Sequence, residues 1–276
     1  MIKDLLVNLS LNAKTDVASE FALSIGERFK AHVDALAFAY KMTYPGSVAD
    51  GFAASLLTQR NEEFIQAANQ AKSRFDAAAS GRGVASSSYI LATEMADAGD
   101  QFGQSARCYD LAVVAQEEPD DSSALDLIIE GALFQSGRPT MVVPYINRAP
   151  LKLDRVAVCW DGGLNAARAV GNAMPFLKQA GKIEIVTVSA EQEKHKDTSP
   201  SRVAQHLSRH DLKPEIRALS SAGLSVVDTV LSYAADNSID LIVMGAYGHS
   251  RLREFVLGGM TRDILRTMTV PVLMSH

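Results

Sequence analysis

The sequence predicts an α/β fold made of two tandem, doubly wound domains, each with a five-stranded parallel sheet flanked by helices. Short apolar runs alternate with helical patterns along the whole chain. The second half repeats the first: Y-D-L-A-V-V-A-Q near residue 110 corresponds to I-D-L-I-V-M-G-A near residue 240. The length of 276 residues fits two domains of ordinary size.

In the first half, each predicted strand is a short run rich in branched apolar residues, and each predicted helix repeats apolar residues on one face. Thr15 or Asp16 is expected to cap the first helix, and Ser122 or Ser123 the last. Gly81 and Gly83 are expected to stop the long second helix. The predicted strands span residues 2–9, 33–39, 84–91, 111–115 and 140–144, and the helices residues 15–28, 53–79, 93–106 and 122–135.

Residues 145–154 contain Pro150 and show no periodicity, so they are interpreted as a linker, with domains at 1–148 and 149–276. The same order of elements then restarts, and Ser225 is expected to cap the third helix. The predicted strands span residues 156–160, 182–189, 214–219, 241–244 and 270–274, and the helices residues 165–177, 202–209, 225–237 and 259–268.

Composition narrows the classes of function. A net charge of −5 argues against electrostatic binding to nucleic acid or to an anionic membrane. No apolar run approaches the roughly 20 residues that span a bilayer, and the N-terminus lacks signal-peptide features, so a cytoplasmic location is expected. Cys108 and Cys159 are the only cysteines. They exclude a disulfide framework or a four-cysteine metal site, and both are expected to be buried fillers.

The stretch L-I-V-M-G-A-Y-G-H-S-R-L-R-E-F-V-L-G-G-M-T, residues 241–261, carries the main functional signal. An apolar strand leads into a loop bounded by glycines, and a glycine pair then precedes a helix. Glycines let a ligand approach backbone N–H groups, and a helix N-terminus attracts anions. The pattern therefore indicates a phosphate site; the alternative is a plain strand-to-helix loop.

These residues resemble the universal stress protein family, whose ATP-binding members carry G-x2-G-x9-G-[S/T] after the fourth strand. Gly245, Gly248 and Gly258 fit this spacing, and Gly259 occupies the Ser/Thr position. Thr261 fits a hydroxyl residue two positions further on. The family's first strand commonly ends in Asp, which places Asp161 of W-D-G-G there. The resemblance covers both halves, as in a tandem member of the family.

The resemblance implies Rossmann-like sheets of strand order 3-2-1-4-5 that bind ATP, with or without Mg²⁺, at the carboxyl ends of the strands. Asp161 would contact the adenosine end, the backbone of Val188 would meet adenine, and Met244 and Gly245 would line the base and ribose. The residues expected around the phosphates are Gly248, Gly258, Gly259, Met260 and Thr261.

Two departures from the family pattern stand out. Gly259 lacks a hydroxyl, and a hydrogen bond to a charged group is worth about 1.5–3 kcal/mol, or one to two decades in affinity. In the first half, Ser10 stands for Asp161 and Gln116 for Gly245. The acidic segment E-E-P-D-D-S-S opposes an anion there. The N-terminal site is therefore interpreted as lost or repurposed.

Other polar residues have alternative interpretations. His249, Arg251 and Arg253 either neutralise phosphates or form a solvated loop face. His206 and His210, spaced four apart on a helix, resemble a metal-ligand pair. Together with His195 they form a possible cluster, but a polar helix face is the simpler interpretation. Trp160 either stacks on a ligand or packs in the core.

Three functions follow, in order of preference. The first is a stress-response protein that binds an adenine nucleotide and acts as a regulatory module, with at most weak ATPase activity. The second is an interaction protein that does not bind ATP, or binds another small ligand in its N-terminal half. The third is an adenylating enzyme. The family's habit of pairing fifth strands implies that 140–144 and 270–274 pair within the chain as a pseudo-dimer, leaving a homodimer open.

Overall fold

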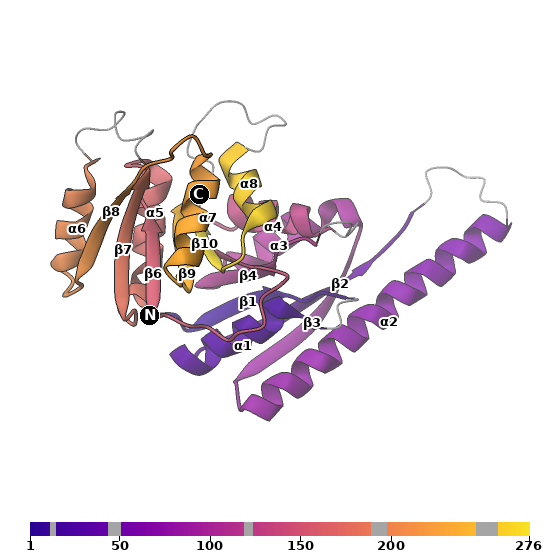
Figure 1. Cartoon of the computed structure of the whole chain (residues 1–276). Coiled ribbons are helices and arrows are strands. Elements are labelled where there is room, and N and C mark those ends of the chain that lie inside the picture. The colour runs from indigo at the N-terminus through magenta and orange to yellow at the C-terminus, as the bar shows by residue number, and fades with distance from the viewer. Residues whose placement is uncertain (12–14, 44–50, 119–123, 189–197, 247–258) are drawn as a thin grey trace. The chain divides into compact units, whose positions relative to one another are not determined.

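The computed structural model describes all residues except 12–14, 44–50, 119–123, 189–197 and 247–258, and omits the side chains of 51–54 (Figure 1). Contacts between Cα atoms divide the chain into two compact units, Met1–Arg138 and Pro139–His276. The α/β class predicted from the alternating pattern is confirmed, because strands and helices alternate through both units.

The N-terminal unit contains a four-stranded parallel sheet of order β3-β2-β1-β4. The crossovers through α1 and α2 run from β1 towards β3, whereas the crossover through α3 runs back from β3 to β4, and α4 packs on α3. Right-handed connections therefore place α1 and α2 on one face of the sheet and α3 and α4 on the other. The elements are β1 (Asp4–Asn8), α1 (Val17–Phe29), β2 (His32–Tyr40), α2 (Gly51–Arg82), β3 (Ser86–Thr93), η1 (Met95–Asp97), α3 (Ala98–Ala106), β4 (Leu111–Ala115) and α4 (Leu125–Gln135).

The C-terminal unit contains strands in the order β5-β10-β9-β6-β7-β8, parallel except for β5 against β10. Without β5, this order places the third, second, first, fourth and fifth strands of the repeat side by side. The elements are β5 (Thr140–Val143), β6 (Arg155–Cys159), α5 (Leu164–Leu177), β7 (Lys182–Val188), α6 (Pro200–Ser208), β8 (Pro214–Leu219), α7 (Val226–Asp236), β9 (Leu241–Gly245), α8 (Gly259–Thr267) and β10 (Val272–Ser275).

Strand β5 pairs with β10 inside the C-terminal unit. Val142 lies opposite Val272 and Thr140 opposite Met274 in antiparallel register. The pairing of segments 140–144 and 270–274 expected from the sequence is therefore present. It also explains why the chain divides by contacts after Arg138 and not after residue 148.

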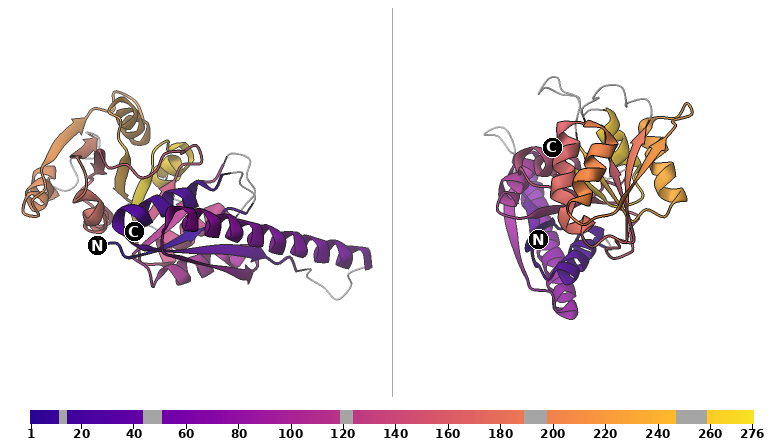
Figure 2. Two further views of the ribbon diagram at one scale, coloured as in Figure 1. Left: turned by 90° about the horizontal axis from the view of Figure 1, so that it is seen from below. Right: turned by 90° about the vertical axis from the view of Figure 1, so that its left-hand side faces the viewer.

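Several element ends differ from expectation for local reasons. The second helix extends from Gly51 to Arg82, beyond the predicted 53–79, and runs along β2 and β3 and past them (Figure 2). Asp16 caps α1 and Ser225 caps α7, as predicted, by accepting from backbone N–H groups. Helix α4 begins after Ala124 without a side-chain cap, and Ser122 and Ser123 lie outside the described residues.

The two halves also join their first and fourth strands by the same kind of hydrogen bond. Asp110 Oδ2 accepts from the backbone N–H of Asp4 at 3.2 Å, and Asp240 Oδ2 accepts from that of Arg155 at 2.9 Å. The two aspartates, which directly precede the equivalent strands β4 and β9, thus have the same structural role in both halves. No helix among the described residues is long and apolar enough to cross a membrane.

A buried carboxylate joins three strands of the C-terminal unit near their amino ends. Glu184 on β7 is fully buried and lies 3.1 Å from Arg155, 3.0 Å from Lys182 and 3.4 Å from Arg217. Burial alone would raise the pKa of Glu184, but hydrogen bonds from Lys182 and Arg155 outweigh it and lower the pKa.

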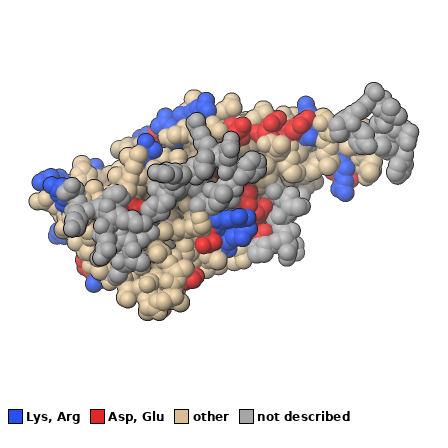
Figure 3. Space-filling model, turned by 90° about the horizontal axis from the view of Figure 1, so that it is seen from above, with Lys and Arg blue, Asp and Glu red and all other residues tan. Residues whose placement is uncertain are grey.

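In the view of Figure 3, positive and negative side chains form separate small groups and no extended surface of one sign.

Stability should depend on pH through Asp16. Burial, only partly offset by hydrogen bonds from the N–H groups of Ser10 and Ser19, raises the pKa of this carboxyl from 3.8 to about 6. The folded state therefore holds the proton more tightly than the unfolded state. We expect the Asp16 contribution to the free energy of unfolding to be full below pH 3.8 and to fall by on the order of 2–3 kcal/mol as the pH rises through about 6.

The measurement is peptide-level hydrogen exchange of α1, with denaturant unfolding, from pH 4 to pH 7 in wild type and Asp16→Asn. Asparagine caps a helix but does not ionise, so the variant should lose this pH dependence. Asp126→Asn, at an exposed position of α4, is the matched control and should keep it. An unchanged slope in Asp16→Asn would assign the pH dependence to other groups.

Candidate ligand-binding site at the carboxyl ends of the C-terminal strands

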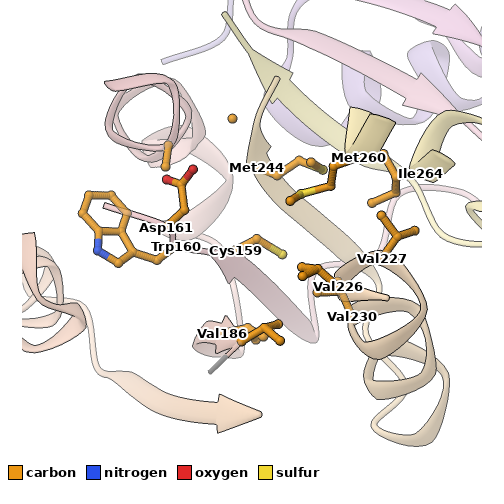
Figure 4. A pocket seen from close by; sticks show the side chains of 13 residues that line it. Cys159, Trp160, Asp161, Val186, Val226, Val227, Val230, Met244, Met260 and Ile264 are labelled. Carbon is orange, nitrogen blue, oxygen red and sulfur yellow. The ribbon is translucent and has the colours of Figure 1, made fainter. Parts of the chain in front are cut away.

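A pocket lies where the carboxyl ends of β6, β7 and β9 meet the starts of α7 and α8 (Figure 4). Strand order reverses between β6 and β9, and this is where open α/β sheets bind ligands. The lining residues are Cys159, Trp160, Asp161, Ala166, Val186, Val188, Val226, Val227, Val230, Met244, Gly245, Met260 and Ile264. Five of the residues predicted from the sequence are therefore brought together: Asp161, Val188, Met244, Gly245 and Met260.

Asp161 supplies the only carboxylate among these lining residues. The chain turns directly after it through Gly162, which has a φ of 79° that favours glycine. Asp161 Oδ1 accepts from the N–H of Gly163, the N-cap of α5, at 2.7 Å. This local turn holds the carboxylate at the pocket, where it can accept hydrogen bonds from a ligand's hydroxyl or amino groups.

The remaining wall is mainly apolar. Val186 and Val188 come from β7, and the first turns of α7 add Val226, Val227 and Val230. Sequence reasoning missed the α7 valines. Their signal was present as an i, i+1, i+4 spacing directly behind the Ser225 cap, which turns one helix face toward the strand ends. An apolar slot with one carboxylate suits a flat heterocycle joined to a hydroxylated group.

Gly245 is required by packing as well as by its place at the pocket. A Cβ there would lie 2.5 Å from the backbone N of Ala166 and 2.6 Å from the carbonyl carbon of Asn165. Asn165 Nδ2 also donates to the Ala246 carbonyl at 2.6 Å. The end of β9 therefore lies directly against the start of α5, and the glycine makes that approach possible.

Replacing Gly245 with Ala should destabilise the C-terminal unit by about 1–3 kcal/mol, because backbone atoms must move apart. Trp160 is the only tryptophan and lines the same pocket, so its fluorescence reports the unfolding of this unit. Gly171→Ala is the control: it lies in α5 with nothing within 4 Å of a Cβ, and should be neutral or stabilising. Equal midpoints for the two variants would contradict the packing role of Gly245.

The start of α8 differs partly from expectation. Gly259 is the first helical residue and is exposed, and Met260 lines the pocket. Thr261, expected near phosphate, is buried and is not one of the lining residues. Gly248 and Gly258 lie outside the described residues, as do His249, Arg251 and Arg253.

Trp160 lines the pocket, and its Nε1 donates to the Thr198 carbonyl at 2.8 Å. The expectation that both cysteines are buried fillers is wrong: Cys108 is exposed and Cys159 is half-buried at the pocket. Cys108 follows the end of α3, where the chain turns at the surface.

The rings of His206 and His210 lie edge to face, 4.9 Å apart. His195 lies outside the described residues. In the described part of the chain, no group of three His, Cys, Asp or Glu side chains is placed to hold a metal ion.

The equivalent place in the N-terminal unit has a different lining. Leu5 pairs with Leu111 as Val156 pairs with Leu241, which aligns Asn8 with Cys159 and Ser10 with Asp161. The same register aligns Ala115 with Gly245, so the expectation that Gln116 stands for Gly245 is wrong by one residue. Strands β4 and β9 both begin directly after an aspartate, Asp110 and Asp240, so the fifth residue of each strand, Ala115 or Gly245, is the equivalent one.

The N-terminal unit packs differently around the equivalent place. Phe102 occupies in α3 the position of Val230 in α7, and it is fully buried. Helices α3 and α4 meet through glycines: a Cβ on Gly131 would lie 1.8 Å from the Gly99 carbonyl oxygen. The N-terminal unit therefore differs from the C-terminal unit in packing at this place, and the loss of its site stays a prediction. The acidic segment E-E-P-D-D-S-S, expected to oppose an anion, spans residues 117–123. Residues 119–123 lie outside the described residues.

Comparison with known proteins finds sequence matches for the C-terminal part of the chain. The sequence model of the universal stress protein family matches residues 152–276. A universal stress protein of Synechocystis sp. is 48% identical over 46 residues, and one of Methanocaldococcus jannaschii is 33% identical over 46 residues. These matches cover 17% of this chain and only 16% and 28% of the two relatives.

Solved structures extend the similarity of fold to the whole chain. A universal stress protein from Archaeoglobus fulgidus is 17% identical with a TM-score of 0.68, covering 99% of this chain and 97% of that one. A putative universal stress protein from Pseudomonas aeruginosa is 15% identical with a TM-score of 0.59, covering 99% and 93%. At this level of identity the comparison concerns the fold alone.

Proposed function

We propose that the C-terminal unit, whose residues 152–276 match the sequence model of the universal stress protein family, binds an adenine nucleotide, ATP, and that the chain acts as a nucleotide-responsive regulatory module. The observation that carries this proposal is the pocket at the strand ends. It has an apolar slot on one side, the Asp161 carboxylate at its edge, and the start of α8 on the other side.

Each wall has a role in the proposal. Adenine lies between the β7 and α7 valines, with the backbone of Val188 reading its edge. Asp161 accepts hydrogen bonds from the adenosine end. Met244 and Gly245 line the ribose. The charge on Asp161 disfavours an extra phosphate on the ribose, because two negative groups would lie together.

The phosphates lie toward the N-terminus of α8, whose free N–H groups and dipole favour negative charge. Gly259 and Met260 begin this helix. By the family pattern, Gly248 and Gly258 add backbone donors and Thr261 lies nearby. A bound Mg²⁺ would reach the site with the phosphates and offset their charge.

Binding is proposed in preference to catalysis. The described lining contains one carboxylate, one thiol and otherwise apolar or glycine residues, without a base in place to activate water. Turnover of ATP is then slow, as expected for a site that holds its ligand.

Calorimetric titration with ATP and Mg²⁺ tests the proposal, with Trp160 fluorescence as a second signal. Asp161→Ala and Gly248→Val should both weaken binding. Ser10→Ala, at the equivalent place in the N-terminal unit, is the matched control and should bind as wild type. No heat and no thermal shift at millimolar ATP would refute ATP binding.

The glycine at position 259 favours a second candidate function, that of an interaction protein that does not bind ATP. Its exposed backbone offers no hydroxyl to a phosphate. This candidate predicts the negative titration just described. The third, an adenylating enzyme, predicts steady release of AMP and pyrophosphate, which a coupled assay detects.

A further inference from the structure

Three sulfur-bearing side chains from three different elements line the same pocket. Cys159 is the last residue of β6, and Met244 is the residue before the last in β9. Met260 is in the first turn of α8. Figure 4 shows the three side chains pointing into one space. Met244 is 6% exposed, and Cys159 and Met260 are half-buried.

The kind of ligand atom restricts the metal that such a set could hold. Mg²⁺ and Ca²⁺ require several oxygen ligands, and Asp161 is the only carboxylate of the lining. Zinc requires three or four thiolate, imidazole or carboxylate ligands, and the described residues contain no group of three such side chains. One thiolate with two thioethers is a soft donor set of the kind that selects Cu(I).

The flexibility of the two methionine side chains favours a compact site. Methionine has three rotatable side-chain bonds, so the thioethers of Met244 and Met260 can turn toward the thiol without backbone movement. The apolar wall of Val226, Val227 and Val230 excludes water and so favours a monovalent ion held by soft ligands over a hydrated divalent ion.

We propose that Cys159, Met244 and Met260 form a binding site for one Cu(I) ion. The Cys159 thiol loses its proton to solvent as its sulfur binds the ion, and the two thioethers bind without a proton change. One proton is therefore released for each ion bound, and the copper stays in the Cu(I) state throughout.

The test is an anaerobic titration of the full chain with Cu(I), in competition with bathocuproine disulfonate, which reports free Cu(I) by its colour. Wild type should bind one ion per chain and release one proton in weakly buffered solution. Met244→Leu and Met260→Leu conserve volume and should each weaken binding by about tenfold or more, since even supporting residues around metal ligands contribute tenfold. Cys159→Ser should abolish both binding and proton release.

Cys108→Ser is the matched control, because it removes the only other thiol, which is exposed on the other unit. It should bind as wild type. Undiminished binding in Cys159→Ser, or loss of binding in Cys108→Ser, would overturn the proposal. So would full affinity in both leucine variants, which would show a thiol acting alone. The titration is run without nucleotide, because Met244 and Met260 also line the proposed ATP site. Failure to bind Cu(I) would therefore leave the proposed ATP site standing, and failure to bind ATP would leave the copper site standing.

Discussion

Gly259→Ser should raise the affinity for ATP by about 10- to 100-fold. The serine hydroxyl would donate to a phosphate oxygen, and a hydrogen bond to a charged group is worth about 1.5–3 kcal/mol. The structure allows this gain because Gly259 begins α8 at an exposed position, and nothing lies within 4 Å of a Cβ built there. Calorimetric titration with ATP at fixed Mg²⁺ measures the change.

Gly259→Ala separates the hydroxyl from the backbone effect, because alanine stiffens the helix start in the same way but donates nothing. It should bind ATP close to wild type. If serine and alanine improve binding equally, rigidity explains the gain; if neither changes it, the phosphates do not lie at the start of α8. A serine-specific gain would also show that the phosphates lie within hydrogen-bond reach of position 259.

The strands and the pocket edge were predictable from sequence because their signals are local. Four apolar residues before Gly245 mark a buried strand whatever surrounds them. Parallel strands bring their carboxyl ends to one edge, so residues just past those ends, such as Asp161, meet there. Chain order alone therefore places Asp161, Met244 and Gly245 together.

The opposite wall depends on packing between distant segments, which local patterns do not encode. The valines of α7 have the spacing of an ordinary core-facing helix, and only the fold shows that this face meets the pocket. Gly245 also shows that local patterns do not reveal contacts between distant segments. The loop pattern explained it by ligand approach, whereas the structure shows α5 at 2.5 Å from a Cβ built there.

Gly131→Ala should be one of the most destabilising single substitutions in the N-terminal unit, at about 3–5 kcal/mol. A Cβ at Gly131 would lie 1.8 Å from the Gly99 carbonyl oxygen, and one at Gly103 would lie 2.3 Å from the Gly131 carbonyl oxygen. Both neighbours are helix backbone, which cannot rotate aside as a side chain can. Helices α3 and α4 must therefore separate along their contact.

Hydrogen exchange of peptides from α3 and α4 measures this effect, because global unfolding of a chain with two units need not be two-state. Gly81→Ala in α2 is the control, since nothing lies within 4 Å of its Cβ, and alanine there should be neutral or stabilise by up to about 1 kcal/mol. Unchanged protection of α3 and α4 in Gly131→Ala would contradict the glycine contact. The predicted loss of protection would show that the packing of α3 on α4 depends on this glycine contact.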